Sequence, residues 1–239
     1  GGPVKVGVAI SDQMAGMNAL AAILAALLKR ERTGEGEYID VALLDATVAA
    51  LINQASTYLV SGIVPQRMGN AHPTVVPYQA FATADGHIIL AVGNDGQFAR
   101  FCAVAGLEHL AEDERYKTNA ARIINRDTLI PQIAEAIKRR TSAEWIKLLE
   151  SKAVPCGPIN TIDQVFADPQ VQARGMRRVL QHERIGSLPV VANPVRMASH
   201  DTTAQKAPPL LGEDTDAVLS GLLGLSAEQI EALRSEGIV

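Results

Sequence analysis

The feature that most constrains the fold is residues 4–32, where an alternating apolar run gives way to apolar residues at helical spacing. The alternating residues are Val4, Val6, Val8 and Ile10. Alternation of this kind is typical of a short buried strand, and the spacing from Met17 to Leu28 is typical of a helix. Asp12 is therefore predicted at the junction where a strand ends and a helix begins.

A second strand is predicted over residues 37–43, after a helix that ends at a left-handed cap on Gly34. Strand, helix and strand in this order form a βαβ unit, which implies a parallel sheet and a right-handed crossover. The chain enters its first strand directly after Gly-Gly-Pro, and a single strand cannot form a sheet. We therefore expect the partner strands to lie in a preceding part of a longer protein.

The remaining elements are predicted from periodicity and turn residues. A helix is expected over 44–60 and a boundary loop over 63–77. The Asp85-Gly86 turn predicts a β-hairpin over 78–92. Further helices are expected within 95–106, 119–125, 128–140, 142–152 (with Ser142 as N-cap), 162–167, 169–173, 214–223 and 226–236. Short strands are expected at 176–182, 188–191 and 194–199.

Composition narrows the class of protein. The 239 residues are 47% hydrophobic with a formal net charge of −4, which gives no electrostatic case for nucleic acid or an anionic membrane. Cys102 and Cys156 match no zinc or redox spacing and are interpreted as reduced thiols of a cytoplasmic protein. The longest apolar run, residues 19–28, is about half of a bilayer span, so no transmembrane helix is predicted.

Asp12 has two interpretations on local sequence. Ser11 or Asp12 could simply cap the following helix. Alternatively, a carboxylate at the carboxyl end of a parallel strand faces helix N–H groups and could act as a nucleophile or a base. Ala15 and Gly16 are small enough to let a substrate approach. Both interpretations stay open at this point.

The loop Arg67–Pro73 is the second candidate, because a Gly69-Asn70 turn precedes His72. It could be an ordinary connection, or a mobile loop that closes over a site. The other histidines give no metal-binding spacing. Cys156 lies between two prolines without a basic partner in its segment, so a catalytic thiol is not expected.

Taken together, four segments resemble the class III coenzyme A-transferases, the CaiB–BaiF family that includes formyl-CoA transferase and carnitine CoA-transferase. They are AALLKRERTGEGEYIDVALLDA, RMGNAHPTVVPYQAFATADGHIILAVGNDGQF, VPCGPINTI and PPLLGEDTDAVL. With the Asp12 junction, the resemblance covers nearly the whole chain.

The resemblance implies an α/β fold with a Rossmann-like large domain, only partly present here, and a smaller inserted α+β domain. Residues 1–44 would end the first half of the large domain, and 45–66 would be a linker helix. Residues 67–172 would form the small domain, and 173–239 a linker and the return to the large one. The family assembles as a homodimer whose two chains interlock.

The resemblance also implies roles for individual residues. Asp12 falls on the family's catalytic aspartate, whose carboxylate attacks an acyl-CoA thioester. Leu43 matches a position near the coenzyme, and Gly69, Asn70 and His72 lie in the loop near the substrate. Coenzyme A is expected as part of the substrate, with a carboxylic acid as its partner substrate. No metal, nucleic acid or membrane is expected.

One departure bears on the acceptor acid. Formyl-CoA transferase carries a glycine run where this chain reads His72-Pro73-Thr74-Val75-Val76. Oxalate is therefore doubtful, and this form resembles relatives that use small dicarboxylates such as succinate or glutarate.

Two alternatives to an active transferase remain open. The α-methylacyl-CoA racemases share the fold, but they tend to carry Glu–Pro–Gln–Phe where this chain has Asp95-Gly96-Gln97-Phe98. The difference favours a transferase. The polypeptide could also be an inactive fragment of either enzyme.

Overall fold

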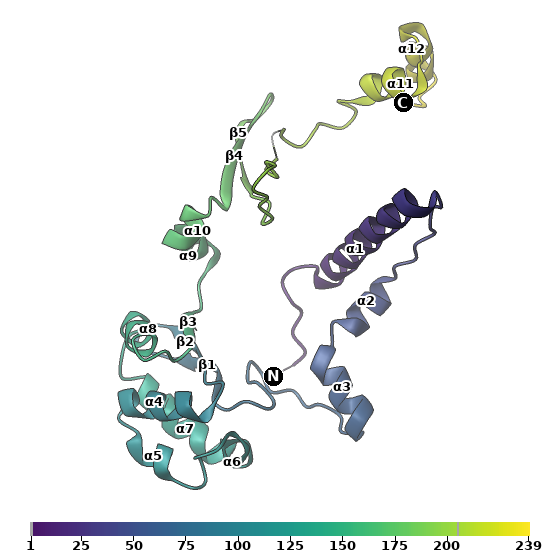
Figure 1. Ribbon diagram of the computed structural model, residues 1–239. Coiled ribbons are helices and arrows are strands. Elements are labelled where there is room, and N and C mark those ends of the chain that lie inside the picture. Colours follow the sequence, from purple (N-terminus) through teal and green to yellow (C-terminus); the bar gives the residue numbers. More distant parts are fainter. Residues whose placement is uncertain (1, 205) are drawn as a thin grey trace. The chain divides into compact units, whose positions relative to one another are not determined.

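The computed structural model describes residues 2–204 and 206–239, which divide into two compact units at Thr74 and Val75 (Figure 1). The first unit holds α1 (Ile10–Thr33), α2 (Leu43–Ala49) and α3 (Ile52–Ser61). The strands of the second are β1 (Tyr78–Ala82), β2 (His87–Ala91), β3 (Cys156–Pro158), β4 (Arg177–His182) and β5 (Gly186–Val191). Its helices are α4 (Asp95–Ala105), α5 (Glu108–Glu112), α6 (Asn119–Ile124), α7 (Arg126–Ile137), α8 (Ser142–Glu150), α9 (Ile162–Ala167), α10 (Pro169–Ala173), α11 (Thr215–Leu223) and α12 (Ala227–Ser235).

In the first unit, α2 packs against the long helix α1 (Figure 1). The helix α1 ends as predicted, because Gly34 adopts a left-handed conformation (φ 75°) and its N–H donates to the Arg30 carbonyl at 2.8 Å. Within residues 2–74, Ala46 is the one buried hydrophobic side chain. The apolar side chains of α1 are thus left largely exposed.

The two strands predicted around α1 are absent. Residues 4–9 and 37–42 are irregular, and Val4 is 91% exposed. A strand exists only by hydrogen bonding to a neighbour, and no described segment pairs with either stretch. The alternation of apolar residues was therefore real, but the βαβ prediction is wrong for the structure of this chain.

The helix predicted over 44–60 is also wrong as a single element. The chain forms α2 and α3, separated at Leu51, because Ile52 takes a left-handed backbone conformation (φ 43°). The N–H of Leu51 donates to the Val48 carbonyl at 3.1 Å, three residues back rather than four. Neither glycine nor proline marks this break, which is why periodicity did not reveal it.

The second unit contains the hydrophobic core, around an antiparallel sheet of order β1-β2-β3. The predicted hairpin is confirmed: Tyr78 pairs with Ala91 and Ala82 with His87. Its core side chains come from the sheet, from α4, α5, α7 and α8, and from the connections between these elements. They are Val76, Phe81, Ile88, Leu90, Val92, Phe98, Phe101, Cys102, Leu107, Leu110, Tyr116, Leu129, Ile133, Ala136, Ile137, Trp145, Leu149 and Val154.

Two helix starts in this unit show how local sequence sets the boundaries. Asn94 caps α4, with its side chain accepting from the Gln97 N–H at 2.9 Å. The cap of α8 is Thr141 and not Ser142 as predicted. Thr141 forms a capping box with Glu144, whereas the Ser142 N–H donates to the Asp85 carboxylate at 2.8 Å.

The buried side chain of Arg122 links the residue Val76, just before β1, to Asp95 at the start of α4. Arg122 is fully buried, and its Nε donates to the Val76 carbonyl at 2.6 Å. Its Nη1 donates to the Tyr116 carbonyl at 2.9 Å, and its Nη2 pairs with Asp95 at 2.9 Å. The guanidinium also lies 4.4 Å from the Phe98 ring centroid. Burial lowers the pKa of Arg122, and the Asp95 carboxylate opposes that shift.

After α10 the chain forms a separate two-stranded antiparallel sheet, β4-β5, as predicted. The third strand predicted over 194–199 is absent. Pro194 has no N–H to donate, and Asn193 bonds within its own loop, to Val195 and Thr202. The tail forms α11 and α12, and the predicted capping box of Ser226 with Gln229 is confirmed.

Candidate functional site

All five predicted site residues lie in the first unit, on three separate segments. Asp12 is the third residue of α1, Leu43 is the first residue of α2, and Gly69, Asn70 and His72 lie in the connection after α3. The helices α1 and α2 pack against one another, so Asp12 and Leu43 lie on two helices that are in contact.

The capping interpretation of Ser11 and Asp12 is wrong. The N-cap of α1 is Ala9, which offers no side-chain acceptor, and its carbonyl accepts from the Gln13 N–H at 3.1 Å. Asp12 is therefore inside the first turn, near the N–H groups and the partial positive charge of the helix N-terminus. Its side chain is exposed. A carboxylate in this place is available to an external electrophile.

Gly16 supports the idea that something approaches this face of α1. It lies four residues after Asp12 and so on the same side of the helix. A Cβ built on Gly16 would meet no atom within 4 Å. Glycine inside a helix is unfavourable by about 1 kcal/mol relative to alanine. Since packing within this chain does not require glycine there, close approach by another molecule would explain it.

Leu43 begins α2 with 52% of its surface exposed. Its side chain was expected near the coenzyme, at the end of a strand; the structure places it instead at a helix start, after the extended N-cap residue Ala42. An exposed leucine beside α1 offers an apolar contact, which suits the non-polar parts of a coenzyme A thioester.

The candidate loop contains a tight turn. Gly69 has φ 62°, a conformation that favours glycine, and the Ala71 N–H donates to the Met68 carbonyl at 3.1 Å. His72 is partly buried, and its Nδ1 accepts from the Thr74 N–H at 3.2 Å. In the neutral ring the proton then lies on Nε2, which can donate to a carboxylate.

Hydrogen bonds anchor the chain at Val76, shortly after this loop. Val76 is fully buried; its N–H donates to the Asn119 side chain at 3.1 Å and its carbonyl accepts from Arg122 at 2.6 Å. The loop therefore leaves a fixed point at the start of β1. Sequence reasoning missed this anchor, because Asn119 and Arg122 are 43 and 46 residues away along the chain.

No group of three or more His, Cys, Asp or Glu side chains that could hold a metal occurs within residues 2–204 and 206–239. Burial raises the pKa of Cys102 to about 12 and also raises the pKa of Cys156, so both favour the thiol over the nucleophilic thiolate.

The prediction of no transmembrane helix rested on the apolar run of residues 19–28, which is only part of α1. At 24 residues α1 is, by length and composition, long and apolar enough to cross a membrane, and it lies near the N-terminus. The same properties occur in helices that other protein surfaces cover. Its uncharged part, residues 13–28, would span about 24 Å at 1.5 Å per residue, short of the roughly 30 Å hydrocarbon core.

Known proteins resemble the chain closely. It is 45% identical to a succinate–glutarate CoA-transferase of Agrobacterium fabrum over 93% of this chain and 56% of that protein. It is 38% identical to the human succinyl-CoA:glutarate CoA-transferase over 100% of this chain and 55% of that protein. The chain thus spans about half the length of these relatives.

Comparisons with solved structures and with protein families agree with the similarity to CoA-transferases. A crystal structure of a CaiB/BaiF family protein from Brucella suis aligns with a TM-score of 0.75 at 42% identity, covering 92% of this chain and 57% of that one. This likeness confirms the predicted mixed α/β fold class. Residues 1–215 match the profile of CoA-transferase family III. The chain therefore belongs to CoA-transferase family III.

Proposed function

We propose that the protein represented by this chain transfers coenzyme A between an acyl-CoA thioester and a carboxylic acid. The observation that carries the proposal is the 45% identity over 93% of the chain to a relative with this named activity. The named relatives include succinate–glutarate, succinyl-CoA:glutarate and succinyl-CoA:mesaconate CoA-transferases. All of these acids are small dicarboxylates, so we propose a small dicarboxylate as the acceptor.

Asp12 is the proposed nucleophile. Its carboxylate attacks the thioester carbonyl, the C–S bond breaks, and coenzyme A leaves as the thiolate, which yields an acyl-aspartyl anhydride. The thiolate then attacks the aspartyl carbonyl and releases the donor acid, which leaves an aspartyl-CoA thioester. The acceptor carboxylate attacks that thioester to form a second anhydride. The thiolate finally attacks the acyl carbonyl, which gives the new acyl-CoA and restores Asp12.

The position of Asp12 suits these steps. The carboxylate lies in the exposed first turn of α1, and the missing side chain of Gly16 leaves room one turn further along. Gly69, Asn70 and His72 are proposed to contact the acid substrate. Leu43 is proposed to contact the coenzyme.

The proposed assembly extends beyond this chain. We propose that residues 1–44 belong to a Rossmann-like large domain, that residues 67–172 form the small domain, and that two copies interlock as a homodimer. In that arrangement protein, and not lipid, covers α1. The exposed apolar side chains of α1 support this, because they need a cover and the uncharged stretch is short for a bilayer.

The decisive test uses the full-length protein with succinyl-CoA and a panel of acids that includes glutarate, mesaconate and oxalate. Glutarate should be converted to its thioester, and hydroxylamine should trap an acyl-aspartyl enzyme. Asp12→Ala should reduce the exchange to background. The matched control is Asp45→Ala, because Asp45 is the exposed third residue of α2 and should retain exchange within several-fold.

The rival isomerase predicts different results. Incorporation of solvent deuterium at the α-carbon of an acyl-CoA, without acyl exchange, would replace the transferase proposal by a racemase. Exchange that survives in Asp12→Ala would remove Asp12 from the proposed role. The same exchange assay on residues 1–239 alone tests whether this polypeptide is an inactive fragment. Exchange above background would exclude that alternative, and no exchange would support it.

A further inference from the structure

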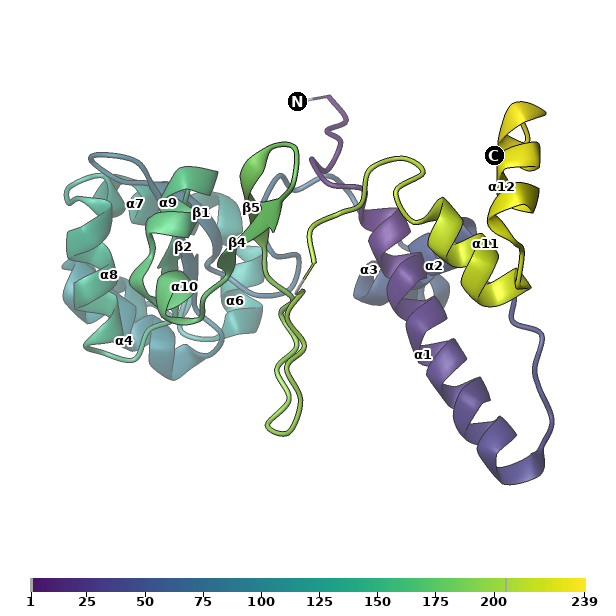
Figure 2. The same ribbon diagram turned by 90° about the horizontal axis from the view of Figure 1, so that it is seen from above.

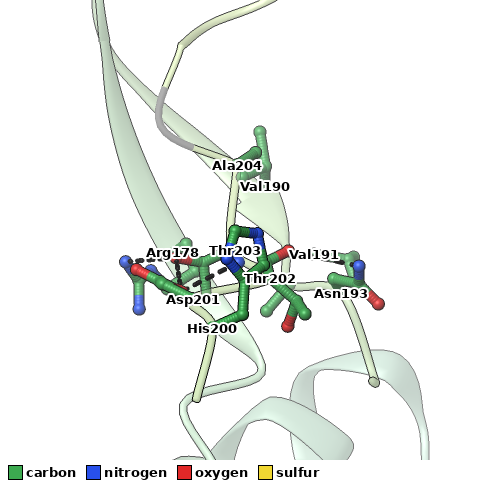
Figure 3. Close-up of a pocket in the computed structure, with 10 residues that line it drawn as sticks. Arg178, Val190, Val191, Asn193, His200, Asp201, Thr202, Thr203 and Ala204 are labelled. Carbon is green, nitrogen blue, oxygen red and sulfur yellow. Dashed lines mark hydrogen bonds between the residues drawn. The ribbon is translucent and has the colours of Figure 1, made fainter. Parts of the chain in front are cut away.

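A cavity outside the proposed site lies beside the β4-β5 hairpin (Figure 3). Its volume is about 430 Å³, and a second hollow of about 380 Å³ shares much of its lining. The walls come from the end of α10 and the residues after it (173–175), from β4, from the end of β5 and from residues 192–204. All of these lining residues belong to the second unit, whereas Asp12, Leu43 and His72 belong to the first.

Hydrogen bonds across the ends of the loop 193–202 hold its shape. The Asn193 amide donates to the Thr202 carbonyl at 3.2 Å, and the Val195 N–H donates to Asn193 Oδ1 at 2.9 Å. The Thr202 hydroxyl donates to the Val195 carbonyl. Figure 2 shows this segment leaving the hairpin and returning beside itself. The Ala192 N–H bonds the Met176 carbonyl at 2.9 Å, which ties the loop to the hairpin.

The lining is strongly basic although the chain as a whole is acidic. Arg174, Arg178 and Arg196 line the second hollow together with His200, and of these residues Arg178 and His200 also line the first cavity. None of the three guanidinium groups has a carboxylate within 4.0 Å in residues 2–204 and 206–239. Asp201 is the carboxylate of the lining, and its Oδ1 already accepts from the Thr203 hydroxyl at 2.6 Å and N–H at 2.9 Å.

One hydrogen bond is seen for the Arg178 guanidinium within the described residues. Its Nη2 lies 3.5 Å from the Thr203 hydroxyl oxygen, a long contact that uses one of five guanidinium N–H groups. Several arginines around one hollow repel one another unless an anion lies between them. A guanidinium presents paired donors that match the oxygens of phosphate.

We propose that the second hollow, of about 380 Å³, binds a phosphate-bearing anion through Arg174, Arg178 and Arg196. Two sources share that chemistry: free inorganic phosphates, and the phosphate groups of a coenzyme A molecule. The second source rests on the proposed function. Binding of the first does not require transferase activity.

The test titrates residues 1–239 with pyrophosphate, with coenzyme A and with dephospho-coenzyme A by isothermal calorimetry. Wild-type protein should show saturable binding that weakens with added NaCl, as expected for arginine–phosphate contacts. Arg178→Gln and Arg196→Gln should each weaken binding of pyrophosphate about ten-fold, as expected for loss of a charge-assisted pair. Far-ultraviolet circular dichroism should show that both variants keep the wild-type fold.

The matched control is Arg177→Gln. Arg177 is the neighbouring residue on β4, so its side chain points to the opposite face of the hairpin, and it does not line the cavity. Its variant should bind pyrophosphate as the wild type does. Equal losses in Arg177→Gln and Arg178→Gln would overturn the proposal, since net charge alone would then explain binding. The absence of saturable binding by wild-type protein would also overturn it.

The ligand series separates the two sources. Coenzyme A binding about ten-fold tighter than both pyrophosphate and dephospho-coenzyme A would identify the coenzyme, through its 3′-phosphate. Equal or tighter binding of pyrophosphate would identify free phosphates. Asp12→Ala should leave pyrophosphate binding unchanged, so failure of the proposed transferase and failure of this site are distinguishable.

Discussion

Two regions of similar length differ sharply in how they are stabilised. Residues 75–158 bury a continuous hydrophobic core, whereas residues 2–74 bury a single hydrophobic side chain, Ala46. Yet the candidate site residues, Asp12 among them, all belong to the poorly buried region. The comparison indicates that the region with a core can fold by itself, while the region with the proposed chemistry leaves most of its apolar side chains uncovered.

The largest expected effect separates the two regions physically. A fragment of residues 75–160 should unfold cooperatively on heating, because its core and three-stranded sheet are complete within it. A fragment of residues 1–74 should show no cooperative transition as a monomer, since its helices have little to bury. Circular dichroism melting, with sedimentation to report association, measures both. A sharp transition in monomeric 1–74 would contradict the comparison.

The next effect concerns the buried arginine of the core region. Arg122→Ala should destabilise the 75–160 fragment by about 3–5 kcal/mol, because buried carbonyl acceptors of Val76 and Tyr116 lose their donor and a cavity remains. Chemical denaturation gives the value. The control Arg115→Ala removes an exposed side chain paired with Asp113 and should change little. Comparable losses in both variants would show that Arg122 is not the anchor.

A matched pair of leucines tests burial directly. Leu149 is fully buried in α8, and Leu149→Ala should lower the free energy of unfolding by about 2–5 kcal/mol. Leu24 in α1 is 58% exposed, so Leu24→Ala should have a much smaller effect on residues 1–239. Denaturation of both variants provides the comparison. In the full-length protein, a large effect of Leu24→Ala would show that other protein surface covers α1.

The smallest effect concerns acid stability. The Ser142 N–H and the Thr83 hydroxyl donate to the Asp85 carboxylate, at 2.8 Å and 3.0 Å, and hold its pKa below the ordinary value of 3.8. Below 3.8 the unfolded state binds more protons, so this stabilisation is present above 3.8 and is lost as the pH falls further. Asp85→Asn should therefore be less stable than wild type at pH 7, with the difference shrinking below pH 4.

Urea unfolding of the 75–160 fragment from pH 7 to pH 3 measures this prediction. Asp127→Asn, which changes an exposed carboxylate near the start of α7, serves as the control. A difference between wild type and Asp85→Asn that is the same at both pH values would show that the charge of Asp85 is not involved.

Local sequence was sufficient for elements whose hydrogen bonds close within a few residues. The hairpin around Asp85-Gly86, the cap at Gly34 and the Ser226 capping box all follow from side chains at fixed short spacings. The family, too, was identifiable from sequence, because its segments keep their residues in order. Asp12, Leu43 and the Gly69–His72 loop were selected in this way, and their roles stay predictions.

Only the tertiary structure decided features that depend on distant partners. The alternating valines of residues 4–10 carry a strand pattern, but a strand needs a neighbour, and none pairs with them in the described chain. The anchoring of Val76 by Arg122 and the gathering of Arg174, Arg178 and Arg196 around one cavity were equally invisible. The physical reason is common to all three: pairing, burial and clustered charge are set by which residues the fold brings together, and spacing along the chain does not contain that information.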